Sequence, residues 1–204
     1  MKTIIHPTYF PNIASFVGMV QASTVVMEAE DNFQKQTYRN RAYIYGANGI
    51  LTLNIPVRYT QNNRQKYREV MIANDENWQD HHWKSIESAY RTSPFFEYYE
   101  DDLRPLFKVK KELLFDFNME CIDTISACFG LELKVEKSTE FIKDYHNDHD
   151  YRYLVNAKME PPFSFDRYIQ VFSDKHGYIP NLSILDLLFN EGPNTLNYLQ
   201  SQSL

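Results

Sequence analysis

His6 is the residue near the amino terminus most suited to proton chemistry. It follows an apolar, β-branched run at residues 2–5, and Pro7 and Pro11 restrict the backbone after it. An imidazole in such a loop can act as a general base or donate a hydrogen bond to a carbonyl or phosphate oxygen. We predict a catalytic role for His6; the alternative is a loop histidine that is hydrogen-bonded to backbone.

A catalytic histidine needs a partner that sets its tautomer, and a group of acidic residues offers one. Glu28, Glu30 and Asp31 follow a second β-branched run at residues 24–27. If both runs are parallel strands, their carboxyl ends lie at one edge of the sheet, where open α/β sheets hold ligands. We expect Glu28 or Glu30 to orient the imidazole.

Positive charge is concentrated a few residues later in the chain. Lys35, Arg39 and Arg41 lie within seven residues, and Asn40 adds an amide that donates and accepts hydrogen bonds. This combination suits a sugar phosphate, a pyrophosphate or a carboxylate. We predict that Lys35, Asn40 and Arg41 bind substrate; a solvated loop balanced by the preceding acidic residues is the alternative.

Two further residues are candidates for the site. Tyr9 could stack on a sugar or a base, although aromatic residues beside a proline turn often belong to the core. His82 lies on the apolar face of a helix predicted at residues 76–91. We assign Tyr9 to substrate binding and His82 to a supporting catalytic role, with burial in the core as the alternative for both.

A histidine- and aspartate-rich segment raises the question of metal binding. Two imidazoles and two carboxylates occur within five positions, at His146, Asp148, His149 and Asp150. They could hold zinc or a harder divalent ion, but their spacing fits no regular helix or strand. We therefore predict no metal site, and no residue pattern identifies a cofactor.

Several classes of protein are not expected from this sequence. It contains no Gly-rich phosphate loop of the Walker or dinucleotide type, no Gly-x-Ser-x-Gly elbow and no paired CxxC. The net charge of −6 and the pI of about 5.5 argue against nucleic acid as a partner, because binding to phosphate backbones depends on a surplus of Lys and Arg. We expect a small-molecule or sugar-derived substrate.

The elements that position these residues begin with a strand–helix–strand unit. Ile13, Phe16, Val17 and Val20 repeat with helical spacing after an N-cap at Asn12. A helix of this length between the two β-branched runs predicts that they form parallel strands.

The rest of the chain predicts a hairpin and then mainly helices. Alternation at residues 51–55, after a turn at Asn48-Gly49 and apolar residues 42–45, is typical of a β-hairpin. Further elements are predicted as helices at 76–91, 95–107 and 111–129, strands at 131–135 and 168–172, and two short helices near the carboxyl terminus. Ser183 and Asp186 form a capping-box pattern at the first of these short helices. We predict an α/β fold, with a mixed sheet flanked by helices.

Length and composition indicate one globular domain over residues 1–204, with 43% apolar and 24% charged residues.

The two cysteines, Cys121 and Cys128, would lie about 10 Å apart on one helix, beyond disulfide reach. We expect free thiols and a cytoplasmic protein. Residues 3–27 carry no Lys, Arg, Asp or Glu, but polar residues and prolines interrupt them, so neither a membrane span nor a signal peptide is expected.

Five stretches of the chain, in order, resemble the WbqC-like protein family. Residues 6–11 are similar to its His-Gln-Pro-x-Tyr-Phe-Pro start, without the Gln after His6 and with Asn12 in place of an aromatic residue. Residues 34–41 resemble its Gln-x-x-Lys and Asn-Arg pair, and residues 51–57 resemble its Leu-Thr-x-Pro-Val strand. Residues 78–95 resemble its Trp-x-x-x-His helix, and residues 181–193 resemble its carboxyl-terminal signature. The correspondence is weaker at residues 137–158.

Members of this family lie among bacterial genes for O-antigen and other surface polysaccharides. The resemblance therefore implies a cytoplasmic transferase or ligase that acts on sugar or nucleotide-sugar intermediates, for example by acyl or aminoacyl transfer to an amino sugar. The alternative is a non-catalytic protein that binds a glycan or a partner within a polysaccharide-assembly complex.

Overall fold

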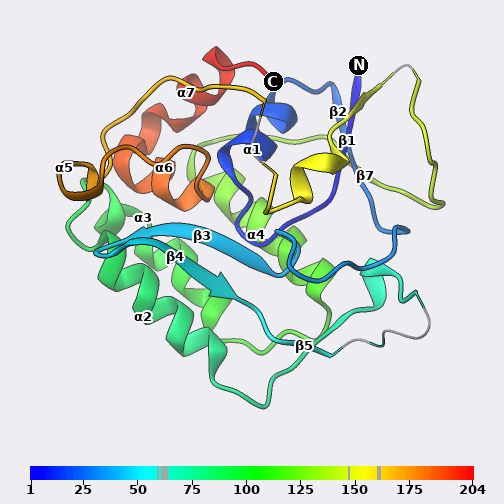
Figure 1. Ribbon diagram of the computed structural model, residues 1–204, viewed down its shortest axis with the longest axis horizontal. Helices are drawn as coiled ribbons and strands as arrows, with labels where there is room; N and C mark the ends of the chain where they lie inside the picture. Colours follow the sequence, from blue (N-terminus) through cyan, green and yellow to red (C-terminus); the bar gives the residue numbers. More distant parts are fainter. Residues whose placement is uncertain (59, 61–63, 147, 160–161) are drawn as a thin grey trace.

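The computed structural model describes residues 1–58, 60, 64–146, 148–159 and 162–204, and within these ranges the fold is built around a four-stranded parallel sheet. In sheet order the strands are β7 (Val135–Lys137), β2 (Thr24–Met27), β1 (Lys2–Ile5) and β8 (His149–Asp150). In the pairing of β1 with β2, Ile4 lies opposite Val26. The predicted α/β class and the parallel pairing of the first two strands are confirmed (Figure 1).

A helix, α1 (Ile13–Val20), connects β1 to β2 as predicted. The side chain of Asn12 caps it by accepting a hydrogen bond from the backbone of Ser15 at 2.9 Å. Its side chains are almost all buried, because α1 packs against β1 and against the helices α6 (Ile184–Glu191) and α7 (Thr195–Ser201). The loop that carries His6 is therefore held between a strand and a helix that are both well packed.

The predicted hairpin consists of β3 (Arg41–Gly46) and β4 (Gly49–Asn54). Its two-residue turn is Ala47-Asn48, one residue earlier than predicted. Gly49 begins β4 with a φ of 99°, which favours glycine. A second antiparallel pair joins β5 (Val57–Arg58) to β6 (Met71–Ile72).

Helices occupy much of the remaining chain. The other α-helices in the described ranges are α2 (Trp78–Tyr90), α3 (Phe96–Leu103), α4 (Leu114–Cys128) and α5 (Ser173–His176). Short 3-10 turns occur at η1 (Tyr67–Glu69), η2 (Arg104–Phe107), η3 (Arg152–Val155) and η4 (Gly192–Asn194). The three helices predicted in the middle are confirmed, although the second changes to 3-10 geometry after Leu103, where Pro105 follows.

Two predicted features near the carboxyl terminus are wrong. Residues 168–172 form no strand, since the side chains of Tyr168 and Gln170 turn inward to Asp186. Ser183 does cap α6, but the Asp186 carboxylate does not return to the cap. It accepts hydrogen bonds from Tyr90 at 2.9 Å, Tyr168 at 2.5 Å and Gln170 at 2.9 Å. Burial raises the pKa of Asp186 to about 6, against the opposing effect of these donors.

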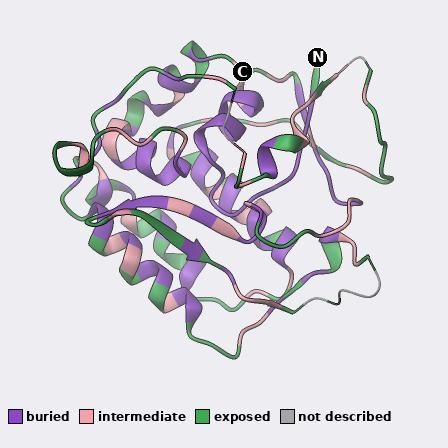
Figure 2. Ribbon diagram, in the orientation of Figure 1, coloured by how far each residue is buried: buried purple, intermediate pink, exposed green. Residues whose placement is uncertain are grey.

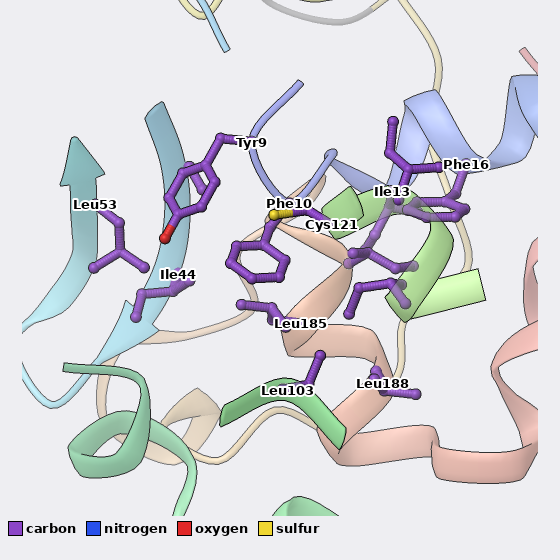
Figure 3. Packing of buried hydrophobic residues seen from close by; sticks show 14 of the residues in the cluster. Tyr9, Phe10, Ile13, Phe16, Ile44, Leu53, Leu103, Cys121, Leu185 and Leu188 are labelled. Carbon is purple, nitrogen blue, oxygen red and sulfur yellow. The ribbon is translucent and has the colours of Figure 1, made fainter. Parts of the chain in front are cut away.

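The core is rich in aromatic side chains, and the buried segments gather at the centre of the molecule in Figure 2. Figure 3 shows Cys121 of α4 within this core, close to Phe10. Cys121 and Cys128 are both free, as predicted, and burial raises the pKa of each thiol. Among the described residues, no helix combines the length and apolar character needed to cross a bilayer.

Candidate functional site

His6 lies directly after the carboxyl end of β1, where it meets Asp31 and Arg39. The His6 Nε2 atom is 2.9 Å from Asp31 Oδ2 and 2.6 Å from an Arg39 Nη2 nitrogen. The same Arg39 nitrogen donates to Asp31 Oδ2 at 2.6 Å. An imidazole, a carboxylate and a guanidinium thus form a closed triangle at the carboxyl edge of the sheet, where open α/β folds hold ligands.

The charges in this triangle shift the pKa values of its members. Burial, and then the charge of Arg39, lower the pKa of His6 to about 4, although Asp31 opposes them. Burial raises the pKa of Asp31, but the His6 hydrogen bond and the Arg39 charge outweigh it and hold that pKa below its usual value. At neutral pH the cluster therefore contains an ion pair and an uncharged imidazole.

The uncharged imidazole has two tautomers with different partners. With a hydrogen on Nε2, His6 donates to Asp31; without it, Nε2 accepts a hydrogen from Arg39. Both arrangements fit the distances in the triangle, so a ligand that contacts His6 can select between them.

The surrounding chain fixes the position of Arg39. Its guanidinium lies over the ring of Tyr67, 5.3 Å from the centroid, and its backbone carbonyl accepts a hydrogen bond from Asn118 at 2.7 Å. Tyr67 in turn donates to the carbonyl of Pro7 at 2.6 Å. These contacts join the loop after β1 to the segment before β3. In the loop after β1, Phe10 has a φ of 39°, a strained value for a bulky residue.

The triangle opens into a hollow of about 380 Å³, which we call the His6 hollow. Its lining residues are His6, Asp31, Gln34, Arg39, Phe141, Arg152, Tyr153, Val155, Asn156 and Met159. Arg152 is paired with Asp150 at 2.5 Å and with the fully buried Glu28 at 3.5 Å. The volume is within the range of about 300–1,000 Å³ that is usual for ligand sites.

The predicted substrate-binding residues Lys35, Asn40 and Arg41 line a different hollow. This Arg41 hollow, of about 280 Å³, is completed by Gln36, Asn54, Ile55, Pro56 and Val57. It contains two cationic side chains, three amides and no acidic side chain. The consecutive residues Gln34 and Lys35 line different hollows, so one loop contributes to both.

His82 and Tyr9 lie together in the core, outside both hollows. The Tyr9 hydroxyl is 3.0 Å from His82 Nδ1, and Tyr9 has no exposed surface. Figure 3 shows the Tyr9 ring in the core cluster with Ile44, Leu53 and Phe10. Burial lowers the pKa of His82 to about 4. The structure therefore brings neither residue to a surface where a ligand could meet it.

The histidine- and aspartate-rich segment is divided among separate contacts. Asp148 accepts a hydrogen bond from the backbone of Lys2, and His149 stacks on Tyr151. Asp150 pairs with Arg152, whereas His146 is exposed. No group of three or more His, Cys, Asp or Glu side chains is placed to hold a metal ion in the described ranges.

The free energy of unfolding should decrease as the pH falls from 6.5 to 4. The pKa of both His6 and His82 is about 4 in the folded state and near 6.5 when exposed, so the unfolded state binds more protons in this window. Each histidine contributes on the order of 3 kcal/mol at neutral pH that is lost through this window. Asp186, with its raised pKa, acts in the opposite direction and reduces the net loss.

Urea unfolding followed by tryptophan fluorescence between pH 4 and 7.5 measures this dependence. In a His82→Gln variant the decrease should be smaller by on the order of 3 kcal/mol, the contribution of one histidine. A decrease of the same size in the variant and the natural protein would contradict the prediction.

Three charged residues of the His6 hollow, Asp31, Arg39 and Arg152, were not among the residues predicted from the sequence to form the site. Asp31, and not Glu28 or Glu30, contacts His6, while Glu30 pairs with Arg68 at 3.1 Å. Arg39, although part of the predicted cationic stretch, was not assigned to the site. For Arg152 the sequence offered no signal, because it follows an irregular polar segment.

The fold and these groups define an α/β protein with a polar cluster at the carboxyl edge of its parallel sheet. The chain belongs to the WbqC-like protein family, whose model matches residues 6–161. It is similar to "Uncharacterized protein Rv1507c" of Mycobacterium tuberculosis, with 22% identity over 223 aligned residues that cover 97% of this chain and 96% of that protein. No solved structure matched the chain.

Proposed function

We propose that this protein is a transferase or ligase that acts on a sugar or nucleotide-sugar intermediate of bacterial surface-polysaccharide biosynthesis, by acyl or aminoacyl transfer to an amino sugar in the cytoplasm. The observation that carries the proposal is the His6–Asp31–Arg39 triangle in the wall of a hollow at the carboxyl edge of the sheet. Family membership supports the same proposal.

In this proposal His6 polarises a substrate carbonyl or phosphate oxygen as a neutral hydrogen-bond donor. An imidazole whose pKa is about 4 is a weak base at neutral pH, but it remains uncharged and can donate from one ring nitrogen. Asp31 stabilises the tautomer with a hydrogen on Nε2, and Arg39 stabilises the one that leaves the hydrogen on Nδ1 for a substrate oxygen. The triangle is thus suited to donor catalysis more than to proton abstraction.

The Arg41 hollow would bind the anionic part of the substrate. Lys35 and Arg41 supply positive charge there, and no carboxylate among the lining residues competes with a phosphate. The Nε atom of Arg41 is buried and makes no hydrogen bond within the described residues. A phosphate or carboxylate that accepts from this atom would satisfy it.

A thermal-shift panel identifies the substrate class. Nucleotide sugars, amino sugars, acyl donors and amino acids are each added to the protein, because a ligand of the native state raises the unfolding midpoint. Anionic sugars should give the largest shifts. If no compound in the panel shifts the midpoint, the proposal of a sugar substrate is wrong.

Variants of His6 and Arg41 should separate turnover from binding. With a substrate identified in the panel, His6→Ala is expected to reduce turnover by about a hundredfold while binding changes little. Arg41→Ala should weaken charged ligands selectively, since it removes a cation from the hollow. The exposed His81 serves as the control, and His81→Ala should leave both quantities unchanged. Normal turnover in His6→Ala would exclude His6 from the mechanism.

A second candidate function is non-catalytic binding of a glycan or a partner in a polysaccharide-assembly complex. The low pKa of His6 favours it, because general bases work best with a pKa near the working pH. Ligand binding without turnover, equally strong in natural protein and His6→Ala, would establish this function instead.

A further inference from the structure

Two exposed aromatic rings stand in the wall of the His6 hollow. Phe141 is 47% exposed and Tyr153 is 41% exposed, although both are large apolar side chains. One side of the Phe141 ring is covered by the Arg152 guanidinium, 5.1 Å from the ring centroid. Exposed rings beside a polar cavity offer their faces to a ligand.

We propose that the His6 hollow binds a pyranose ring, which stacks its C–H face on Phe141 and Tyr153 and turns its hydroxyl groups to the polar wall. This inference rests on the proposed function in taking a sugar as the substrate. It adds the residues that recognise the ring.

The charge balance of the hollow favours an uncharged ring. Arg39 is matched by Asp31, and Arg152 by Asp150 and Glu28. No surplus of positive charge remains there for a phosphate, whereas no acidic side chain lines the Arg41 hollow. The two hollows therefore differ in the chemistry that each can bind.

The polar groups of the hollow match hydroxyl groups. The Asp31 side chain is 19% exposed and accepts hydrogen bonds only, whereas the exposed amides of Gln34 and Asn156 both donate and accept. A sugar hydroxyl can donate to the Asp31 carboxylate, and it can both donate to and accept from the amides of Gln34 and Asn156.

Arg152 positions the Phe141 ring. Besides its ion pairs, its guanidinium donates to the backbone carbonyls of Ile142 at 2.7 Å and Lys143 at 2.8 Å. It also lies 5.0 Å from the ring centroid of Tyr145. One side chain thus fixes the segment that carries Phe141, so the ring is held in place before a ligand arrives.

Saturation-transfer difference NMR tests the proposal on the full chain. The probes are the methyl glycosides of glucose, galactose, mannose and N-acetylglucosamine, with uridine and adenosine for comparison. In the natural protein the ring C–H protons of at least one glycoside should receive saturation. Phe141→Leu, which keeps an apolar side chain without a ring, and Tyr153→Ala should each reduce this signal at least threefold, whereas Phe141→Trp should retain it.

Tyr98→Ala is the matched control, since Tyr98 is an exposed tyrosine that lines a separate hollow between α3 and α4. It should leave the signal unchanged. Full signal in Phe141→Leu and Tyr153→Ala, signals from nucleosides alone, or no glycoside signal in the natural protein would each overturn the proposal. The function is judged separately, because the thermal-shift and His6 experiments are carried out with both rings intact and can succeed even if the sugar ring binds elsewhere.

Discussion

Arg39→Met is expected to lower the free energy of unfolding by about 3 kcal/mol. The guanidinium is almost completely buried, and its loss leaves the Asp31 carboxylate without the cation that it contacts at 2.6 Å. Removing one partner of a buried ion pair costs about 3–5 kcal/mol, and the partial exposure of Asp31 places this pair at the lower end. Methionine fills most of the volume over Tyr67, so the loss of the positive charge accounts for most of the decrease in stability. Urea unfolding at pH 7 measures the effect.

The same substitution should raise the pKa of His6 above its value of about 4. The positive charge of Arg39 lowers that pKa, whereas the hydrogen bond to Asp31 raises it and remains in the variant. Histidine NMR titration gives the shift. Arg41→Met, a partly exposed arginine of the neighbouring hollow, should change neither quantity appreciably. An unchanged His6 titration in Arg39→Met would show that the triangle does not persist in solution.

Asp186→Ala is expected to be the most destabilising substitution, by about 4 kcal/mol or more. It removes the acceptor for the hydroxyls of Tyr90 and Tyr168 and for the amide of Gln170, all of them buried. Each buried donor left without a partner costs about 1–3 kcal/mol, and the cavity adds to the loss. Calorimetric unfolding at pH 7 provides the measurement.

Two companion variants show whether the lost acceptor causes this effect. Asp186→Asn keeps the shape but turns an amide nitrogen toward at least one donor, so an intermediate loss is expected. Asp101→Ala, at an exposed position of α3, should leave stability unchanged. If Asp186→Asn were as stable as the natural protein, the shape of the side chain rather than its acceptor oxygens would matter.

The framework of the fold could be predicted because local patterns specify it. The β-branched runs at residues 2–5 and 24–27, with helical spacing between them, place β1, α1 and β2 correctly. Prediction failed where a contact distant in sequence decides the structure. Tyr168 resembles a strand residue, but its hydroxyl is drawn to Asp186. No repeating pattern of residue types in the sequence indicates that hydrogen bond.

The site was predicted less completely than the fold, for a related reason. His6 could be placed at the end of β1, because the β-branched run at residues 2–5 stops directly before it. Which of three neighbouring carboxylates faces His6 depends on the loop after β2, and loop geometry has no periodic signal. The same holds for Arg39 and Arg41, two residues apart, which line different hollows. Whether these residues act in a reaction stays a prediction.

The sheet joins parts of the chain that are synthesised far apart in time. β1, at residues Lys2–Ile5, pairs with β8, at His149–Asp150, and the backbone nitrogen of Lys2 donates to Asp148. During translation β1 and β2 can meet early, but the wall that carries Arg152 emerges only after more than a hundred further residues. The nascent pair of β1 and β2 therefore stays on the ribosome with both sheet edges uncovered until β7 and β8 emerge, a stage at which chaperone protection is most useful.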